Sequence, residues 1–227
     1  GIASVIVGTD QGGVPLVQVY NGTSGQLEGN FFAFDQSFTG GVRVSTGDVN
    51  ADGHADIIAA SGPGMVGTVR TFSGSSLQAF SDSDIVPDSG WTGGLYATAG
   101  NFHDAGTTQV AVTFGAGGMP LVNVYNVTPG AATPVSLADN MWAYPLQDQP
   151  GYPGHPAYTG GVRIAAADVD GDGLADILVA TGPQSFPYLR IFKGNTQVEL
   201  KNFYVCPATW GNGFFVSATN NQIAQAT

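Results

Sequence analysis

The chain has 227 residues and a formal net charge of −11 at pH 7, with 43% hydrophobic and 10% charged residues. This negative surplus argues against nucleic acid and anionic membranes as partners. It has 34 glycines and 13 prolines, which favour short strands and tight turns over helices. It contains no apolar run of the roughly 18 residues that membrane insertion requires. Cys206 is the single cysteine, so a disulfide within the chain is excluded.

The predicted strands begin near the start of the chain and follow a repeating order. Ser4–Val7 and Val17–Tyr20 are rich in branched residues and lie between glycine-rich turns, which is typical of strands. A full set of four expected strands comes next: Val42–Gly47, Asp56–Ala60, Thr68–Phe72 and Leu77–Phe80. The pattern continues to the end of the chain, where Phe214–Ala218 is expected as a last, isolated strand.

Two short motifs recur four times and mark the repeating units. An aromatic residue precedes a glycine-bearing turn and a strand at Phe38, Trp91, Tyr158 and Trp210. The third strand of each unit has its own signature: Val17-Gln-Val-Tyr20, Val69-Arg-Thr-Phe72, Val122-Asn-Val-Tyr125 and Leu189-Arg-Ile-Phe192. Four strands in roughly 50 residues is the pattern of a β-propeller blade.

We therefore predict an all-β fold, a β-propeller with four blades of four antiparallel strands in a single domain over residues 1–227. The predicted blades are residues 212–227 plus 1–38, 39–91, 92–158 and 159–211. In this interpretation the N- and C-terminal segments pair within one blade and close the ring. A piece of a longer array has the same local pattern, so a larger chain or a homo-oligomer stays open.

Two loops between predicted strands are rich in carboxylates. Their residues at positions 1, 3, 5 and 9 are Asp168, Asp170, Asp172 and Asp176 in one loop, and Asp48, Asn50, Asp52 and Asp56 in an earlier copy. Alternating oxygens around a glycine bend suit Ca²⁺, which takes six to eight oxygen ligands. The helical type of calcium loop is excluded, because Val179 and Ala59 stand where it needs a glutamate. The alternative is a metal-free turn rich in Asp and Gly.

These features together resemble the FG-GAP/VCBS-type repeats of integrin-α-like propellers. The resemblance rests on the acidic loop between the first two strands and on the turns Ser61-Gly-Pro-Gly64 and Phe114-Gly-Ala-Gly117. It also rests on residues 31–35 followed by 38–44, which are similar to tandem repeats of large bacterial surface or secreted proteins. The resemblance covers essentially the whole chain. Integrin-type propellers normally have seven blades, so four units depart from that pattern.

The resemblance implies two Ca²⁺ sites with a structural role, each tying the first strand of a blade to the second. It adds the carbonyl oxygens of Leu174 and His54 to the side-chain ligands. The imidazole of His54 is expected to point to solvent, because calcium prefers oxygen ligands. Asn50 lowers the ligand charge of the earlier loop, so we expect weaker binding there.

Aromatic residues form a second candidate site. The four motif aromatics are expected on the face opposite the acidic loops, where they either plug the gaps between blades or stack on a sugar or peptide. Arg43 and Arg163 are expected to face each other in the central channel, around an anion or water, or paired with acids or carbonyls. The candidate ligand-binding residues are Trp91, Trp142, Tyr152, His155, Tyr158 and Trp210.

The sequence favours a non-catalytic binding, adhesion or structural module, secreted or displayed on a cell surface, where millimolar Ca²⁺ suits weak loops. Its expected partner is an extracellular protein or a glycan. One alternative is a lectin that uses the aromatic face. The other is a secreted glycoside hydrolase or other hydrolase, whose candidate carboxylates are Asp10, Asp35, Asp104 and Asp148. No catalytic residues are assigned, because nothing in the sequence places two of these carboxylates together.

Overall fold

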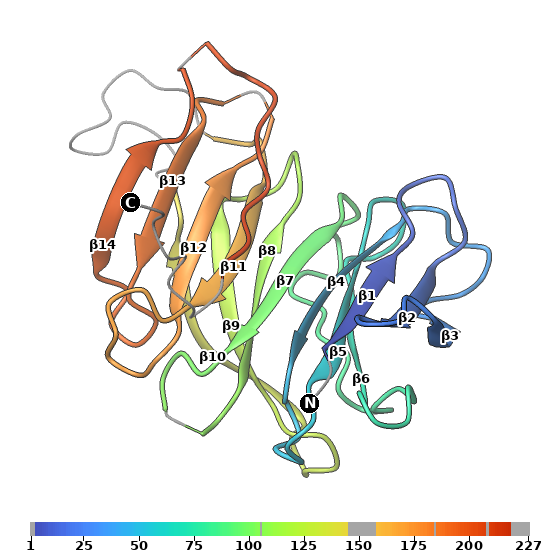
Figure 1. Ribbon diagram of the computed structural model, residues 1–227. Coiled ribbons are helices and arrows are strands. Elements are labelled where there is room, and N and C mark those ends of the chain that lie inside the picture. The colour runs from blue at the N-terminus through green and yellow to red at the C-terminus, as the bar shows by residue number, and fades with distance from the viewer. Residues whose placement is uncertain (1–2, 105, 145–157, 184, 208, 219–227) are drawn as a thin grey trace.

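The computed structural model describes residues 3–104, 106–144, 158–183, 185–207 and 209–218. This described part consists of strands, turns and loops without a helix, and thus without a helix capable of crossing a membrane. The strands form four antiparallel sheets that follow one another along the chain (Figure 1). The prediction of an all-β fold is therefore confirmed.

The first two sheets have three strands each. The first contains β1 (Ser4–Gly8), β2 (Leu16–Asn21) and β3 (Leu27–Phe32) in that order. The second contains β4 (Val42–Gly47), β5 (Asp56–Ser61) and β6 (Val69–Phe72).

The third and fourth sheets have four strands each. The third contains β7 (Leu95–Gly100), β8 (Gln109–Phe114), β9 (Leu121–Val127) and β10 (Val135–Trp142). The fourth contains β11 (Val162–Ala167), β12 (Asp176–Thr181), β13 (Tyr188–Phe192) and β14 (Glu199–Tyr204).

The strands β5, β8 and β12 form the core of the molecule, and all of their residues are buried. Successive side chains of a strand point to opposite faces of its sheet. Ile57 of β5 therefore packs towards the first sheet and Ile58 towards the third. In the same way, Ile177 of β12 packs against the third sheet. Burial on both faces explains why these strands are nearly continuous apolar runs in the sequence.

The strands β4, β7 and β11 lie along the common axis of the sheets. Both β4 and β11 lie beside β7. Together with residues 215–218, these three strands line a cavity of about 490 Å³. The cavity thus has one wall from each of four successive units, as expected of the inner strands of a propeller.

The aromatic-Thr-Gly-Gly motif joins neighbouring sheets through the main chain. Its threonine carbonyl accepts a hydrogen bond from a glycine of the preceding unit that has positive φ. The three pairs are Gly12 N–Thr39 O at 2.8 Å, Gly64 N–Thr92 O at 2.9 Å and Gly117 N–Thr159 O at 2.7 Å. The repeated sequence motif is therefore a repeated connection between blades.

The prediction of four strands in every blade is wrong for the second unit. The expected strand Leu77–Phe80 is reduced to an isolated bridge between Phe72 and Ala79. Leu77 has a φ of 58°, and its N–H donates to the Ser73 carbonyl, so this segment begins as a turn. A second isolated bridge joins Val69 to Ile85. Both bridges hold the outer edge of this sheet without a regular strand.

The expected strand Phe214–Ala218 is not formed within the described residues, and β1 pairs with β2 alone. The N–H of Phe214 donates to the Thr181 carbonyl at 3.3 Å, and Phe214 and Val216 pack against the fourth sheet. This apolar burial holds the segment beside β11 (Figure 1). The predicted ring closure through this segment and β1 is therefore not observed. The remaining residues 219–227 lie outside the described part.

Candidate metal centre

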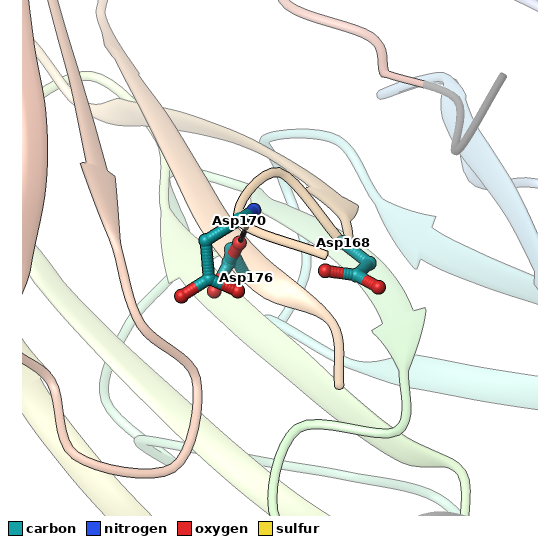
Figure 2. Close-up of side chains that lie close together, drawn as sticks. All are labelled: Asp168, Asp170 and Asp176. Atoms are coloured by element: carbon teal, nitrogen blue, oxygen red, sulfur yellow. Dashed lines mark hydrogen bonds between the residues drawn. The ribbon is translucent and has the colours of Figure 1, made fainter. Parts of the chain in front are cut away.

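The loop between β11 and β12 brings three carboxylates together. Oxygens of Asp168, Asp170 and Asp176 all lie within 4.8 Å of one another. Figure 2 shows these three side chains at the loop. Asp168 and Asp170 belong to the loop, whereas Asp176 is the first residue of β12 and is fully buried. Continuous pairing of β11 with β12, from Val162–Thr181 to Ala167–Asp176, sets the position of both loop ends.

Hydrogen bonds from the main chain fold this loop around its own carboxylates. The two oxygens of Asp168 accept from the N–H groups of Gly171 at 2.7 Å and Gly173 at 3.0 Å. Gly171 and Gly173 have φ values of 80° and 89°, which a glycine adopts without steric cost. Alternating Asp and Gly therefore direct oxygens and N–H groups inwards, as the spacing in the sequence predicts.

Asp176 provides the test of whether a cation fits. Its Oδ2 accepts from the N–H of Val169 at 2.8 Å, but its buried Oδ1 has no hydrogen-bond partner among the described residues. Burial raises the pKa of Asp176, and the charges of Asp170 and Asp172 raise it further. A buried, unpaired carboxylate oxygen beside two other carboxylates is unfavourable without a positive charge. The donor set is entirely oxygen, which suits Ca²⁺.

Asp172, another predicted ligand, has a different partner in the structure. Its Oδ2 lies 2.8 Å from the Nζ of Lys193, which also lies 2.8 Å from Oδ2 of Asp170. The hydrogen bond from Lys193 lowers the pKa of Asp172. The main-chain N–H of Leu174 donates to Oδ1 of Asp172 at 2.9 Å.

Lys193 is the residue that the sequence interpretation missed. It follows β13 at the place where the earlier copy of the repeat has Ser73, which lies just before the corresponding Gly74. Comparing the two copies position by position would have revealed this basic residue next to an acidic loop. The ammonium group supplies positive charge to Asp170 and Asp172 in the absence of a metal.

The earlier loop, between β4 and β5, satisfies its own carboxylates. Asp56 is fully buried, and its oxygens accept from the N–H groups of Val49 at 3.0 Å and Gly74 at 3.0 Å. Burial raises the pKa of Asp56, whereas the hydrogen bond from the Asn50 side chain lowers that of Asp52.

Two further features distinguish this loop from the later one. Ala51 has a φ of 59° where the later loop has Gly171, a conformation that costs a non-glycine residue energy. The side chain of Asn50, which stands where the later loop has Asp170, donates to Asp52 at 3.0 Å. His54 is exposed, and its main-chain N–H donates to Oδ1 of Asp52. Among the described residues, the close group of three carboxylates occurs in the later loop alone.

A third loop has an uncharged side chain where the other two have their buried aspartate. Between β7 and β8, Oε1 of the buried Gln109 accepts from the N–H groups of Phe102 at 2.8 Å and His103 at 3.4 Å. These bonds correspond to those that Asp176 makes to Val169 and Asp170. An uncharged amide is thus sufficient to hold this type of loop.

Two of the predicted ligand-binding aromatics are partly buried and pack against neighbouring core residues. Trp91 makes an edge contact with Phe114 at a centroid distance of 5.7 Å and donates from Nε1 to the Gly94 carbonyl at 2.8 Å. Tyr158 lies 5.1 Å from Tyr144, and its hydroxyl accepts from the N–H of Gly182 at 2.6 Å. Burial raises the pKa of Tyr158 to about 12. These contacts match the alternative in which the motif aromatics plug the gaps between blades.

The other aromatic candidates are exposed or lie outside the described residues. Trp142 at the end of β10 is 47% exposed, and Trp210 is 51% exposed. Trp210 also donates from Nε1 to the Gly213 carbonyl at 3.3 Å. Tyr152 and His155 belong to residues 145–157, outside the described part. The six residues therefore do not form one site within the described structure.

Solved structures with a similar fold include three rhamnogalacturonan lyases. The exotype lyase YesX is 14% identical, with a TM-score of 0.53 over 89% of this chain and 46% of its own. The lyase YesW is 13% identical, with a TM-score of 0.52 over 89% of this chain and 48% of its own. The Bacillus licheniformis lyase PL11 is 12% identical, with a TM-score of 0.50 and the same coverage of both chains. At this identity the likeness concerns the fold alone. The chain spans less than half the length of these enzymes.

Sequence comparison points to a repeat family at the acidic loops. No curated protein matches the chain significantly. The FG-GAP repeat model, however, matches residues 40–76 and 160–196. Each match runs from the start of the glycine pair before the inner strand to the turn after the third strand, and thus includes one acidic loop. The chain therefore contains two FG-GAP repeats, one around each of its acidic loops.

Proposed function

We propose that this chain is a calcium-stabilised propeller module of a secreted or cell-surface protein, which binds an extracellular protein or glycan without catalysis. Two observations about one cluster carry the proposal: oxygens of Asp168, Asp170 and Asp176 lie within 4.8 Å of one another, and the buried Oδ1 of Asp176 has no hydrogen-bond partner among the described residues. The FG-GAP match around this loop supports the same interpretation.

Asp168, Asp170 and Asp176 would hold the ion in the later loop. When bound, Ca²⁺ supplies positive charge to the cluster and links β11 to β12. Asp172 would join these ligands once Lys193 is displaced. The earlier loop would hold a second, weaker ion through Asp48, Asn50, Asp52 and Asp56, because Asn50 carries no charge and both oxygens of Asp56 already accept main-chain hydrogen bonds.

The setting follows from the expected strength of these sites. A cluster with exposed ligands and a competing ammonium group is expected to bind calcium weakly. Extracellular calcium is typically near 1 mM, which is enough to fill weak modules of this kind. The acidic surface, with a net charge of −11, also keeps such a module soluble and apart from anionic surfaces.

Calorimetry and thermal unfolding test the proposed calcium centre. Titration of the chelated protein with CaCl₂ is expected to show binding that magnesium at equal concentration does not reproduce, because Mg²⁺ demands a tighter octahedral site. The melting temperature is expected to rise with calcium and to fall again in EDTA. A melting curve that is identical in EDTA and in millimolar calcium would contradict the proposal.

Polysaccharide binding is the second candidate function. Trp142 and Trp210 are large exposed aromatics, and such rings stack on sugars. The similar solved structures act on a polysaccharide, rhamnogalacturonan. A glycan array that includes rhamnogalacturonan separates this candidate from protein adhesion, and Trp142→Ala and Trp210→Ala are expected to weaken any glycan signal.

The same polysaccharide tests the non-catalytic part of the proposal. Incubation with rhamnogalacturonan is expected to leave the polymer length unchanged and to form no unsaturated, ultraviolet-absorbing sugar ends. Appearance of such ends would show that the module is a lyase.

A further inference from the structure

Two arginines meet at the axis of the molecule. Arg43 lies on β4 and Arg163 on β11, and the ring of Tyr96 on β7 lies between these strands. The guanidinium carbon of Arg43 is 3.9 Å from the centre of this ring, and that of Arg163 is 5.8 Å from it. Arg163 also lies 4.4 Å from the ring centre of Phe215.

Both side chains border a cavity that has a positive lining. A hollow of about 240 Å³ is bounded by Arg43, Arg163, Tyr96 and turn residues of the aromatic-Thr-Gly-Gly face. The larger cavity of about 490 Å³ between the inner strands has the same two arginines in its wall. Among the described residues, neither lining contains a carboxylate. This is unusual in a chain with 17 acidic and 6 basic residues.

The two other arginines of the chain are paired with carboxylates, unlike Arg43 and Arg163. Arg70 pairs with Asp84 at 2.9 Å, and Arg190 pairs with Glu199 at 2.7 Å. Within the described residues, no carboxylate lies within ion-pair distance of Arg43 or Arg163.

The hydrogen bonds of the two arginines leave donors for a ligand. Nη1 of Arg43 donates to the Leu95 carbonyl at 2.7 Å, and Nη1 of Arg163 donates to the Thr181 carbonyl at 3.4 Å. Nε of Arg163 is buried and has no hydrogen-bond partner in the described part of the chain. A buried donor without a partner is unfavourable, and on a charged group the cost is larger.

The charges at this place do not balance by themselves. Burial lowers the pKa of Arg43, and the positive charge of Arg163 lowers it further, whereas Tyr96 and Asp10 raise it. A water molecule accepts a hydrogen bond but does not neutralise two like charges. An anion does both.

We propose that Arg43 and Arg163 bind a small oxyanion, a carboxylate, sulfate or phosphate group, in the axial cavity on the aromatic-Thr-Gly-Gly face. The planar forks of two guanidinium groups match the oxygens of such a group better than they match chloride. The strands β4, β7 and β11 hold both arginines in place, so the site forms at the junction of three sheets. It lies at the opposite ends of these strands from the acidic loops.

Calorimetric titration of the calcium-loaded protein at low ionic strength tests the proposal. Sodium sulfate, inorganic phosphate in a calcium-tolerant range and sodium acetate are the probes, since they separate the possible sources of an oxyanion. At least one of them is expected to bind the wild type. The variants Arg43→Met and Arg163→Met are each expected to weaken that binding by about tenfold or more, as expected for loss of a charge-assisted bond of 1.5 kcal/mol or more.

Lys201→Met is the matched control, because it removes one positive charge from an exposed position on β14. It is expected to change the affinity by less than about twofold, since an exposed distant charge is screened by salt. Equal weakening by Lys201→Met would reduce the effect to net charge and overturn the proposed site.

A measurement on the wild type guards against variants that do not fold. Phenylglyoxal modifies arginine, and mass spectrometry of the peptides reports each position separately. The bound oxyanion is expected to protect Arg43 and Arg163 and to leave Arg70 unchanged. Absence of binding by all three probes would overturn the proposal. So would modification of Arg43 and Arg163 to the same extent with and without the anion.

Discussion

Asp176 and Gln109 show at the residue scale that shape and charge are separate properties of these loops. Both side chains are buried, and both accept two main-chain N–H groups from the loop that precedes their strand. We therefore expect Asp176→Asn to fold but to lose most of its response to calcium. Calcium at about 100 times its Kd contributes about 2.7 kcal/mol, which corresponds to a rise in Tm of roughly 5–10 °C for a chain of this size. Thermal melts with and without calcium measure this difference.

Asp56→Asn is the matched control in the earlier loop. Asp56 accepts N–H groups with both oxygens, so an amide loses one buried hydrogen bond whether or not calcium is present. We expect a loss of about 1–3 kcal/mol in unfolding free energy in EDTA, with most of the calcium response retained. A calcium response that survives Asp176→Asn but disappears in Asp56→Asn would show that the main site lies in the earlier loop, contrary to the proposal.

Lys193 is expected to compete with calcium for Asp170 and Asp172. The variant Lys193→Ser, which copies Ser73 of the earlier repeat, frees both carboxylates. A nearby positive charge opposes the binding of a cation, so calcium affinity is expected to rise by about fivefold or more. Calorimetry gives the Kd directly. An unchanged Kd, with the variant folded, would mean that the ammonium group leaves the calcium position free.

At the scale of the elements, close glycine contacts fix the distance between the inner strand and the turn after the second strand. A Cβ built on Gly182 would lie 2.0 Å from the Gly160 carbonyl oxygen, whereas Gly211 has no atom within 4 Å of its Cβ position. We expect Gly182→Ala to lower the unfolding free energy by about 1–3 kcal/mol through overpacking. Gly211→Ala is expected to change it by less than about 0.5 kcal/mol. Chemical denaturation measures the unfolding free energy of both variants. Equal values would mean that the turn at Gly182 shifts to accommodate the added methyl group.

Tyr158 links the packing between sheets to pH. Burial raises its pKa from the ordinary 10.0 to about 12. Its contribution to stability is therefore complete below pH 10 and is lost as the pH rises towards 12, because the unfolded chain ionises first. The upper limit is about 2.7 kcal/mol. Tyr158→Phe is expected to flatten the alkaline slope of the unfolding free energy. An equal slope in the wild type and in Tyr158→Phe would mean that other tyrosines cause it. Tyr125 is one of these, because burial raises its pKa as well.

At the scale of the whole molecule, the sheets differ in how well their edges are covered. The strands β5, β8 and β12 are buried throughout, whereas β1 has exposed residues such as Val5 and Val7 and lacks an inner neighbour in the described part. We expect the amides of β8 and β12 to exchange slowly with solvent and those of β1 to exchange fast, because unpaired edges open at little cost.

Hydrogen exchange read by mass spectrometry measures this difference. Slow exchange of β1 would show instead that a further strand covers its edge, as the closed four-bladed ring predicts. The mass in solution would then show whether that strand comes from the same chain or from a second copy.

Much of this architecture was predictable because it depends on local patterns. Alternating Asp and Gly residues predict the acidic loops, and runs such as Ile57–Ala60 predict buried strands, since both follow from spacing within a few residues. The aromatic before Thr-Gly-Gly also precedes the first strand of each of the last three sheets, β4, β7 and β11. The connection that the motif makes, a hydrogen bond from the N–H of Gly12 in the preceding unit to the Thr39 carbonyl, depends on which turns meet.

The sequence by itself determined the all-β class, the order of the repeats and the position of both acidic loops, because each depends on residues close together along the chain. Only the tertiary structure decided that Lys193 lies against Asp170 and Asp172 and that Oδ1 of Asp176 lacks a partner. It also decided that residues 214–218 pack beside β11 rather than against β1. These outcomes depend on which surfaces bury the most apolar area and where charges meet across sheets, and neither is encoded in the spacing of neighbouring residues.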